Sequence, residues 1–281
     1  MIRRLAWTAL IVCLVAAHAY AQERRLIIRN FPFSPTDTLL VADSVTIMDS
    51  SPAFDATQPI VYYAKQDQAG FVIVGFNYET REQKIIHRGS GKPSAIRVHP
   101  DGKSVSCLVR ADSRSSLLQI PIGGGNVKTT DLPTLTSNFM WLDDNNAFII
   151  REGKPNTLEL MTLRPQRSTP VAQHVAGSLA KATGEGSFAF IHKLSVDSWS
   201  IKTIRPDGSI KILAEALPET EVFTLTPDGA PVSVSENKLF VFERKRNEWR
   251  ELPDGNVAGN IRYMELNPAR NKLALLVEQE L

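Results

Sequence analysis

A hairpin of two short apolar strands around a polar turn recurs along this chain and limits its possible folds more than any other feature. The clearest copy runs from Ser94 to Val109, where an alternating strand reaches a Pro100-Asp101-Gly102 turn and a second strand follows. Proline presets φ for such a turn, and glycine takes the positive φ that other residues avoid. The segment therefore predicts a tight β-hairpin.

The same arrangement appears five more times along the chain. The further turns lie at Asp55, at Asp143–Asn146, at Gly184–Gly186, at Pro227–Gly229 and at Asn267-Pro268, each with apolar strand residues on both sides. Repeats of roughly 40 residues are typical of architectures in which each unit packs against its neighbours.

A second hairpin follows each of the first five units. These second hairpins begin with Phe71–Phe76, Leu117–Ile122, Leu158–Leu163, Trp199–Ile204 and Leu239–Phe242. Four antiparallel strands in each period are typical of a β-propeller blade. Apolar residues at helical spacing are not sustained after residue 21, so we predict an all-β chain.

The sixth unit has only two strands before the sequence ends at Leu281. An unpaired strand edge favours aggregation. Two short apolar segments, Arg25–Arg29 and Leu39–Ala42, precede the first full unit. We therefore predict a six-bladed β-propeller of four-stranded antiparallel blades, with the last blade closed by these N-terminal strands.

The first 21 residues have the features of a secretory signal. Arg3 and Arg4 precede the apolar run Leu5–Ala17, and Ala19-Tyr20-Ala21 supplies the small residues of a cleavage site. A membrane anchor is the alternative, but the apolar run is shorter than the roughly 20 residues needed to span a bilayer. We expect cleavage before Gln22, no membrane span afterwards, and a bacterial protein that is periplasmic or secreted.

We therefore expect residues 22–281 to form a single propeller domain, whose charge is balanced. Without segment 1–21 the count of basic residues falls from 32 to 30, which equals the 30 acidic residues. This balance gives no support for nucleic-acid binding, which needs a concentrated basic surface. Cys107 is the only cysteine of the mature chain, so we expect no internal disulfide and a packed apolar thiol.

The segment His99–Cys107 resembles the WD40-like repeat of TolB-type propellers, and Thr226–Gly229 is a second, shorter match. His99 and Cys107 depart from the serine and the aromatic residue usual in that motif. The resemblance covers the mature chain as architecture and two blades as sequence. It implies a motif that shapes a turn, so no catalytic residue is carried over, and His99 is expected to be structural.

We expect a non-enzymatic scaffold that binds a protein or a ligand and uses no cofactor or metal. The expected partner is another envelope or secreted protein, or a small anionic ligand, and the propeller itself is expected to be a monomer. The alternative is a propeller enzyme, such as a lactonase, lyase or hydrolase, with its site at the mouth of the central channel. The chain has no Gly-x-Ser-x-Gly motif for a serine nucleophile. Its histidines form no His-x-His or His-Glu-x-x-His pair, although distant blades can still assemble a site.

One repeated charge predicts a binding face. The second strand of four consecutive blades is expected to end in a cation, namely Lys65, Arg110, Arg151 or Lys193. These cations would stand on one face of the ring and attract an anionic partner. The alternative is that they are ordinary solvated charges, neutralised by acidic neighbours such as Glu152.

Overall fold

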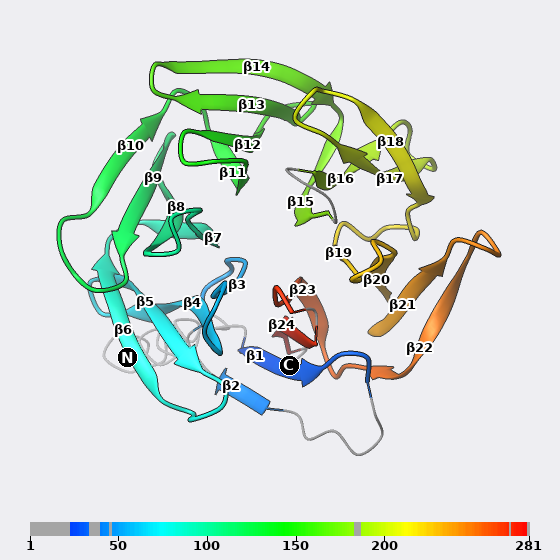
Figure 1. The fold of residues 1–281 in the computed structure, drawn as a ribbon, viewed down its shortest axis with the longest axis horizontal. Coiled ribbons are helices and arrows are strands. Elements are labelled where there is room, and N and C mark those ends of the chain that lie inside the picture. The colour runs from blue at the N-terminus through cyan, green and yellow to red at the C-terminus, as the bar shows by residue number, and fades with distance from the viewer. Residues whose placement is uncertain (1–22, 34–39, 45–46, 183–186, 270, 280–281) are drawn as a thin grey trace, which may run out of the picture.

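The computed structural model describes residues 23–33, 40–44, 47–182, 187–269 and 271–279, and within them it contains 24 strands and no helix. The strands form six four-stranded sheets arranged around a central axis (Figure 1). None of the described residues forms a helix that could cross a membrane. The predicted all-β propeller is confirmed.

Five blades are built from consecutive strands. Blade 1 consists of β3 (Ala53–Phe54), β4 (Ile60–Asp67), β5 (Gly70–Asn77) and β6 (Gln83–Gly89). Blade 2 consists of β7 (Lys92–Val98), β8 (Ser104–Ala111), β9 (Arg114–Pro121) and β10 (Lys128–Leu132). Blade 3 consists of β11 (Thr136–Trp141), β12 (Asn146–Arg151), β13 (Thr157–Leu163) and β14 (Gln166–Gln173). Blade 4 consists of β15 (Val175–Lys181), β16 (Phe188–Lys193), β17 (Trp199–Ile204) and β18 (Ile210–Glu215). Blade 5 consists of β19 (Phe223–Leu225), β20 (Pro231–Ser235), β21 (Lys238–Glu243) and β22 (Glu248–Asn256).

Blade 6 joins the two ends of the described chain. Its strand order is β2 (Leu40–Ser44), β1 (Arg24–Asn30), β24 (Lys272–Glu278) and β23 (Asn260–Leu266). β1 pairs with β24 along its whole length, and Arg24 Nη2 donates to Glu278 Oε1 at 2.7 Å. The predicted closure by N-terminal strands is confirmed, while Leu39 and the predicted signal 1–21 lie outside the described residues.

The turns form for the local reasons that the sequence indicates. Asp101 Oδ1 accepts hydrogen bonds from the backbone N–H groups of Lys103 and Ser104 at 2.7 and 3.0 Å. Gly102 has a φ of +64°, which a residue with a Cβ rarely adopts. Asp143 caps the equivalent turn of blade 3 in the same way. The turn predicted at Gly184–Gly186 lies outside the described residues.

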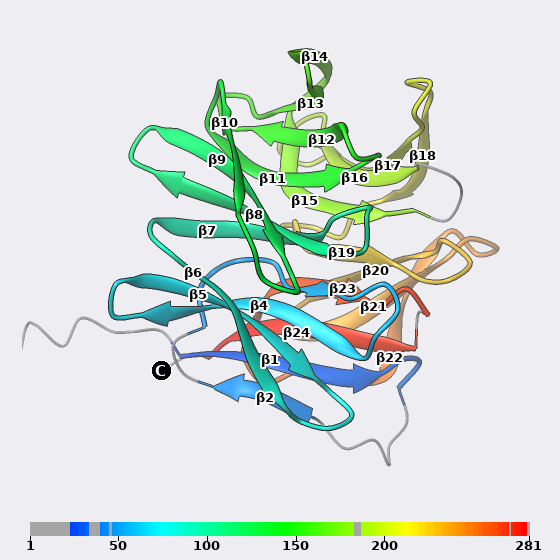
Figure 2. The same cartoon turned by 60° about the vertical axis from the view of Figure 1, so that its left-hand side comes forward.

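The core lies between the blades, which pack face to face around the ring (Figure 2). Leu26 and Ile28 of blade 6 pack with Val61 and Tyr63 of blade 1 in one buried cluster. Similar clusters join the other neighbouring blades, and burial of their apolar area stabilises the ring. Cys107 is fully buried in the cluster between blades 1 and 2.

Candidate functional site

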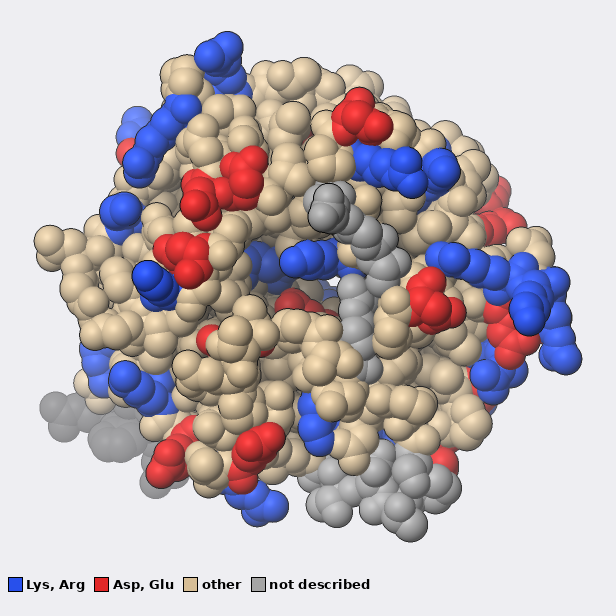
Figure 3. Space-filling model, in the orientation of Figure 1, with Lys and Arg blue, Asp and Glu red and all other residues tan. Residues whose placement is uncertain are grey.

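A cavity of about 500 Å³ lies on the axis of the ring, and its wall contains residues from all six blades. The innermost strands β3, β7, β11, β15, β19 and β23 surround it (Figure 1). Figure 3 shows both basic and acidic side chains inside the central hollow. This channel is therefore the place where polar groups from distant parts of the chain converge.

Arg97 of β7 is buried in the channel wall, with 7% of its side chain exposed. Its Nη1 donates at 2.7 Å to Ser51 Oγ and to the backbone oxygen of Ile96. Its Nη2 donates to Asn138 Oδ1 at 3.1 Å. Nε is buried and has no hydrogen-bond partner. Burial lowers the pKa of Arg97, against the opposing effect of nearby Glu265, but a guanidinium remains charged at any pH a protein tolerates.

Charges of both signs line the channel. Glu265 Oε2 of β23 lies 3.7 Å from Arg97 Nη1, which makes an ion pair longer than a hydrogen bond. Lys181 of β15 lines the same cavity, so the described lining contains the cations Arg97 and Lys181 and the carboxylate Glu265. The pKa of Tyr263 is raised to about 12, mainly by burial and secondly by the negative charge of Asp49, so its phenol keeps its proton.

A run of hydrogen bonds continues from Arg97 through three more blades. Asn138 Nδ2 donates to the backbone oxygen of Gly177 at 2.8 Å. The N–H of Gly177 donates to Glu221 Oε2 at 3.0 Å, and the other Glu221 oxygen accepts from Lys193. These contacts fix the amide of Asn138, and through it they orient the Arg97 guanidinium.

The described residues contain no group of three or more histidine, cysteine, aspartate or glutamate side chains arranged to hold a metal ion. The polar groups of the channel are instead a guanidinium, an ammonium, an imidazole, two amides, hydroxyls and one carboxylate. Chemically, such a wall can donate hydrogen bonds to an anion and orient it.

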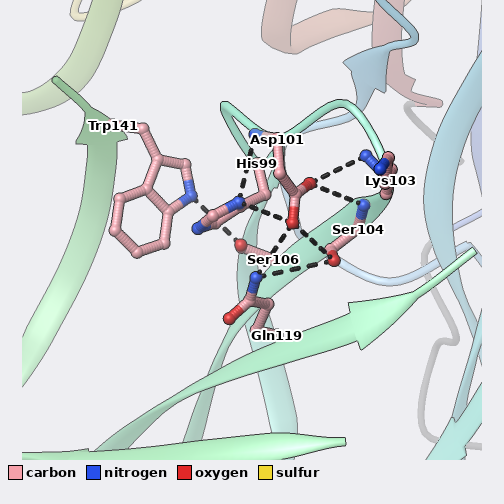
Figure 4. Close-up of polar contacts among 7 residues, drawn as sticks. All are labelled: His99, Asp101, Lys103, Ser104, Ser106, Gln119 and Trp141. Atoms are coloured by element: carbon pink, nitrogen blue, oxygen red, sulfur yellow. Dashed lines mark hydrogen bonds and ion pairs between the residues drawn. The ribbon is translucent and has the colours of Figure 1, made fainter. Parts of the chain in front are cut away.

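A second cavity of about 370 Å³ lies beside the channel, between blades 2 and 3. Trp141 and His99 line both cavities. Figure 4 shows the contact beside them, where Trp141 Nε1 of blade 3 donates to Ser106 Oγ of blade 2 at 3.0 Å. The His99 ring packs edge-on against Trp141, with centroids 4.8 Å apart. His99 Nδ1 also lies 3.1 Å from Asp101 Oδ2. His99 thus links its turn to the neighbouring blade.

The four cations of the predicted anionic-partner face occupy equivalent strands, β4, β8, β12 and β16. Arg151 and Lys193 are the last residues of their strands, whereas β4 continues to Asp67 and β8 to Ala111. The strands extend further because Asp67 still pairs with Gly70 and Ala111 with Arg114 across their hairpins.

Carboxylates lie close to Arg110, Arg151 and Lys193. Arg110 contacts both oxygens of Glu152 in the next blade at 3.0 Å. Arg151 contacts Glu159 at 2.5 Å, and Lys193 contacts Glu221 in the next blade. An anionic partner at this face would have to compete with these carboxylates, and its binding remains a prediction.

Sequence reasoning missed the channel residues Arg97, Asn138 and Glu265. Arg97 stands between two apolar residues on an alternating strand, as an ordinary solvent-facing cation does. Its burial shows only when the ring places the other inner strands around it. The signal available in the sequence was its position on the first strand of a repeat, since that strand lines the axis of a propeller.

Comparison with solved structures supports the fold. No family model and no curated protein sequence matches the chain. A protein of Agrobacterium tumefaciens assigned as TolB superposes with a TM-score of 0.70 at 10% identity, over 93% of this chain and 100% of that one. The WD40 propeller domain of Doa1 gives 0.55 at 12% identity, over 91% and 86%. The Xanthomonas campestris gluconolactonase XC5397 gives 0.60 at 12% identity, over 89% and 94%. The chain is therefore a six-bladed β-propeller whose fold is similar to those of TolB and WD40 propellers, as the His99–Cys107 motif predicts.

Proposed function

We propose that this propeller is an exported, non-enzymatic binding scaffold in the periplasm or outside the cell, and that its partner or ligand enters the central channel. The observation that carries the proposal is the channel wall, where Arg97, Asn138 and Glu265 converge from three blades. Export rests on the predicted signal before Gln22.

The channel has the properties of a binding site rather than of a packing defect. Its volume of about 500 Å³ falls within the range of about 300–1,000 Å³ that is usual for ligand sites. Met140, Trp141 and Leu179 give it apolar surface, and Arg97, Asn138 and Glu265 give it polar groups. Such a combination gives a ligand both buried area and orientation.

The proposal can be tested by photo-cross-linking in cells. A photoreactive amino acid placed at Met140 reports contacts in the channel, and one at Ile212, which is 68% exposed on the outer strand β18, is the control. We expect a discrete adduct from Met140 and none from Ile212. Adducts from Ile212 alone would show that the partner binds the outer rim instead.

Export is tested separately by fractionation and mass measurement. The protein recovered from the periplasm or the medium should begin at Gln22. A product that retains residues 1–21 and stays with the membrane would favour the anchor instead.

A lactonase is the second candidate, because the fold is similar to that of the Xanthomonas gluconolactonase. The test is hydrolysis of gluconolactone by the purified mature chain with and without added divalent cations. Turnover that is lost on substitution of a channel residue would favour the enzyme over the scaffold.

A further inference from the structure

We propose that the central channel selects a neutral, largely apolar small molecule, about the size of two or three aromatic rings, and that a collar of uncharged side chains around the axis holds it. The apolar collar consists of Val98, Met140, Leu142, Val222 and Tyr263, which line the cavity on or next to the innermost strands of blades 2, 3, 5 and 6. The inference rests on the proposed function, because it assumes that the channel is the binding site, and it names the class of ligand.

The side chains that the wall presents to the cavity are mainly apolar. Successive residues of a strand point to opposite sides. Met140 is half-buried between the buried Phe139 and Trp141, and Val98 is half-buried after the buried Arg97. The half-buried residues of the wall are the apolar collar together with Ser178 and Glu265. The fully exposed ones are Ala56, Pro100, Gly102, Pro268 and Lys181. A ligand in the cavity would therefore contact mostly apolar side chains.

The charged groups of the wall are engaged within the protein. Arg97 donates three hydrogen bonds inside the wall, including one to Asn138, and only 7% of its side chain is exposed. Glu265 Oε2 lies 3.7 Å from Arg97 Nη1, and Glu265 and Lys181 each have a further interaction within the protein. An ionic ligand would meet charges that already have partners, and moving its own charge out of water is costly. A neutral ligand avoids that cost.

The size of the cavity favours a small molecule. An apolar cavity of about 150 Å³ holds one benzene molecule, whereas the channel has a volume of about 500 Å³. It therefore has room for about two or three rings. A peptide of that size would bring backbone N–H and C=O groups into the apolar collar, and each such group left without a partner weakens binding. The occupant that we infer is therefore a free neutral compound rather than a segment of a partner chain.

The experiment is fluorescence titration of the full mature chain with matched probes. N-phenyl-1-naphthylamine is neutral and consists of a naphthalene and a phenyl ring, and its fluorescence rises in apolar surroundings. 8-Anilino-1-naphthalenesulfonate has the same rings and adds a sulfonate. The capped dipeptide acetyl-Trp-Trp-amide offers aromatic rings on a peptide backbone. We expect a single neutral probe to bind per chain, with a Kd roughly tenfold or more below those of the sulfonate and the peptide.

Two substitutions in different blades test the assignment of residues. Met140→Gln and Val222→Thr each replace a half-buried apolar side chain with a polar one of similar shape. Each should weaken binding of the neutral probe roughly three- to tenfold, because apolar contact with the probe is lost. Ile212→Gln is the matched control: it removes an apolar side chain that is 68% exposed on the outer strand β18, and it should leave the Kd unchanged.

The wild-type titrations do not depend on either variant, and a thermal melt shows which variants fold. The inference is overturned if the neutral probe does not bind the wild type, if the sulfonate or the peptide binds as tightly, if the Kd is unchanged in every folded collar variant, or if Ile212→Gln weakens binding. A protein adduct at Met140 together with any of these results would leave the scaffold standing and remove the selectivity for apolar ligands. Selective binding of the neutral probe without an adduct in cells would support the selectivity and leave the protein partner unproven.

Discussion

The contact between Trp141 and Ser106 gives the sharpest test of how neighbouring blades are joined. Ser106 is fully buried, and its Oγ accepts the indole N–H at 3.0 Å. Ser106→Ala removes that acceptor and leaves the indole N–H of Trp141 without it, in a residue that is only 8% exposed. A buried donor left unpaired costs about 1–3 kcal/mol. For a domain of this size each kcal/mol lowers Tm by about 2–4 °C.

Chemical denaturation of a two-by-two set of variants isolates this hydrogen bond. Trp141→Phe keeps an aromatic ring beside His99 but has no N–H to satisfy. In that background Ser106→Ala should lower the free energy of unfolding by less than about 0.5 kcal/mol, so the cycle should give a coupling energy of at least about 0.5 kcal/mol.

The control is Ser200→Ala, which changes a half-buried serine on β17 of another blade. Its effect on the free energy of unfolding should be the same whether residue 141 is tryptophan or phenylalanine. If Ser106→Ala lowered the free energy of unfolding equally in the wild type and in Trp141→Phe, the reasoning would be refuted. A loss below about 0.5 kcal/mol in the wild type would refute it as well.

Three further predictions follow from buried or capped groups and one from the charged face. Leu26→Ala should destabilise the ring by about 2–5 kcal/mol in urea denaturation, because Leu26 is fully buried between blades 6 and 1. Burial alone would raise the pKa of Asp101, but hydrogen bonds from Lys103 and Ser104 and the charge of His99 lower it overall. The Asp101 carboxylate therefore stabilises the folded state at pH values above its unfolded pKa of about 3.9. This stabilisation is lost as the pH falls through the lower pKa that Asp101 has in the folded state. Asp101→Asn should then show a smaller loss of Tm between neutral and acid pH than the wild type, and an equal loss would contradict this. Burial raises the pKa of the Cys107 thiol, so a disulfide reagent should react with it only on unfolding, and rapid native labelling would be inconsistent with the packing. If the anionic-partner face is used, Arg110→Glu with Arg151→Glu should weaken capture of an acidic partner, and unchanged capture would argue against that face.

Local features of the sequence were enough to predict the repeating hairpins. Pro100, Asp101 and Gly102 set a turn through their own φ preferences and hydrogen bonds, so no distant contact is needed. The closure of blade 6 was also predictable, since two spare strands at one end matched two missing strands at the other. Both inferences use only strand count and turn chemistry.

The channel could not be predicted in the same way, because its chemistry depends on which residues the ring brings together. Arg97 and Glu265 lie on strands of different blades, and neither has a distinguishing neighbour in the sequence. The pairing of Arg110 with Glu152 in the next blade depends likewise on how two sheets pack. Side-chain partners across blades follow from tertiary geometry, which a single sequence does not contain.

The pairing of β1 with β24 also constrains the order of folding. β1 is made first among the described strands and β24 last, so the β1 edge has no partner until nearly the whole described chain is available. Contacts of such large sequence separation form slowly, because the loop-closure entropy must be overcome first. If the chain crosses a membrane unfolded, blades 1 to 5 can assemble in sequence on the far side while β1 stays exposed. The final step would then be the docking of β23 and β24 against this edge, and a chaperone that shields β1 would act during that interval.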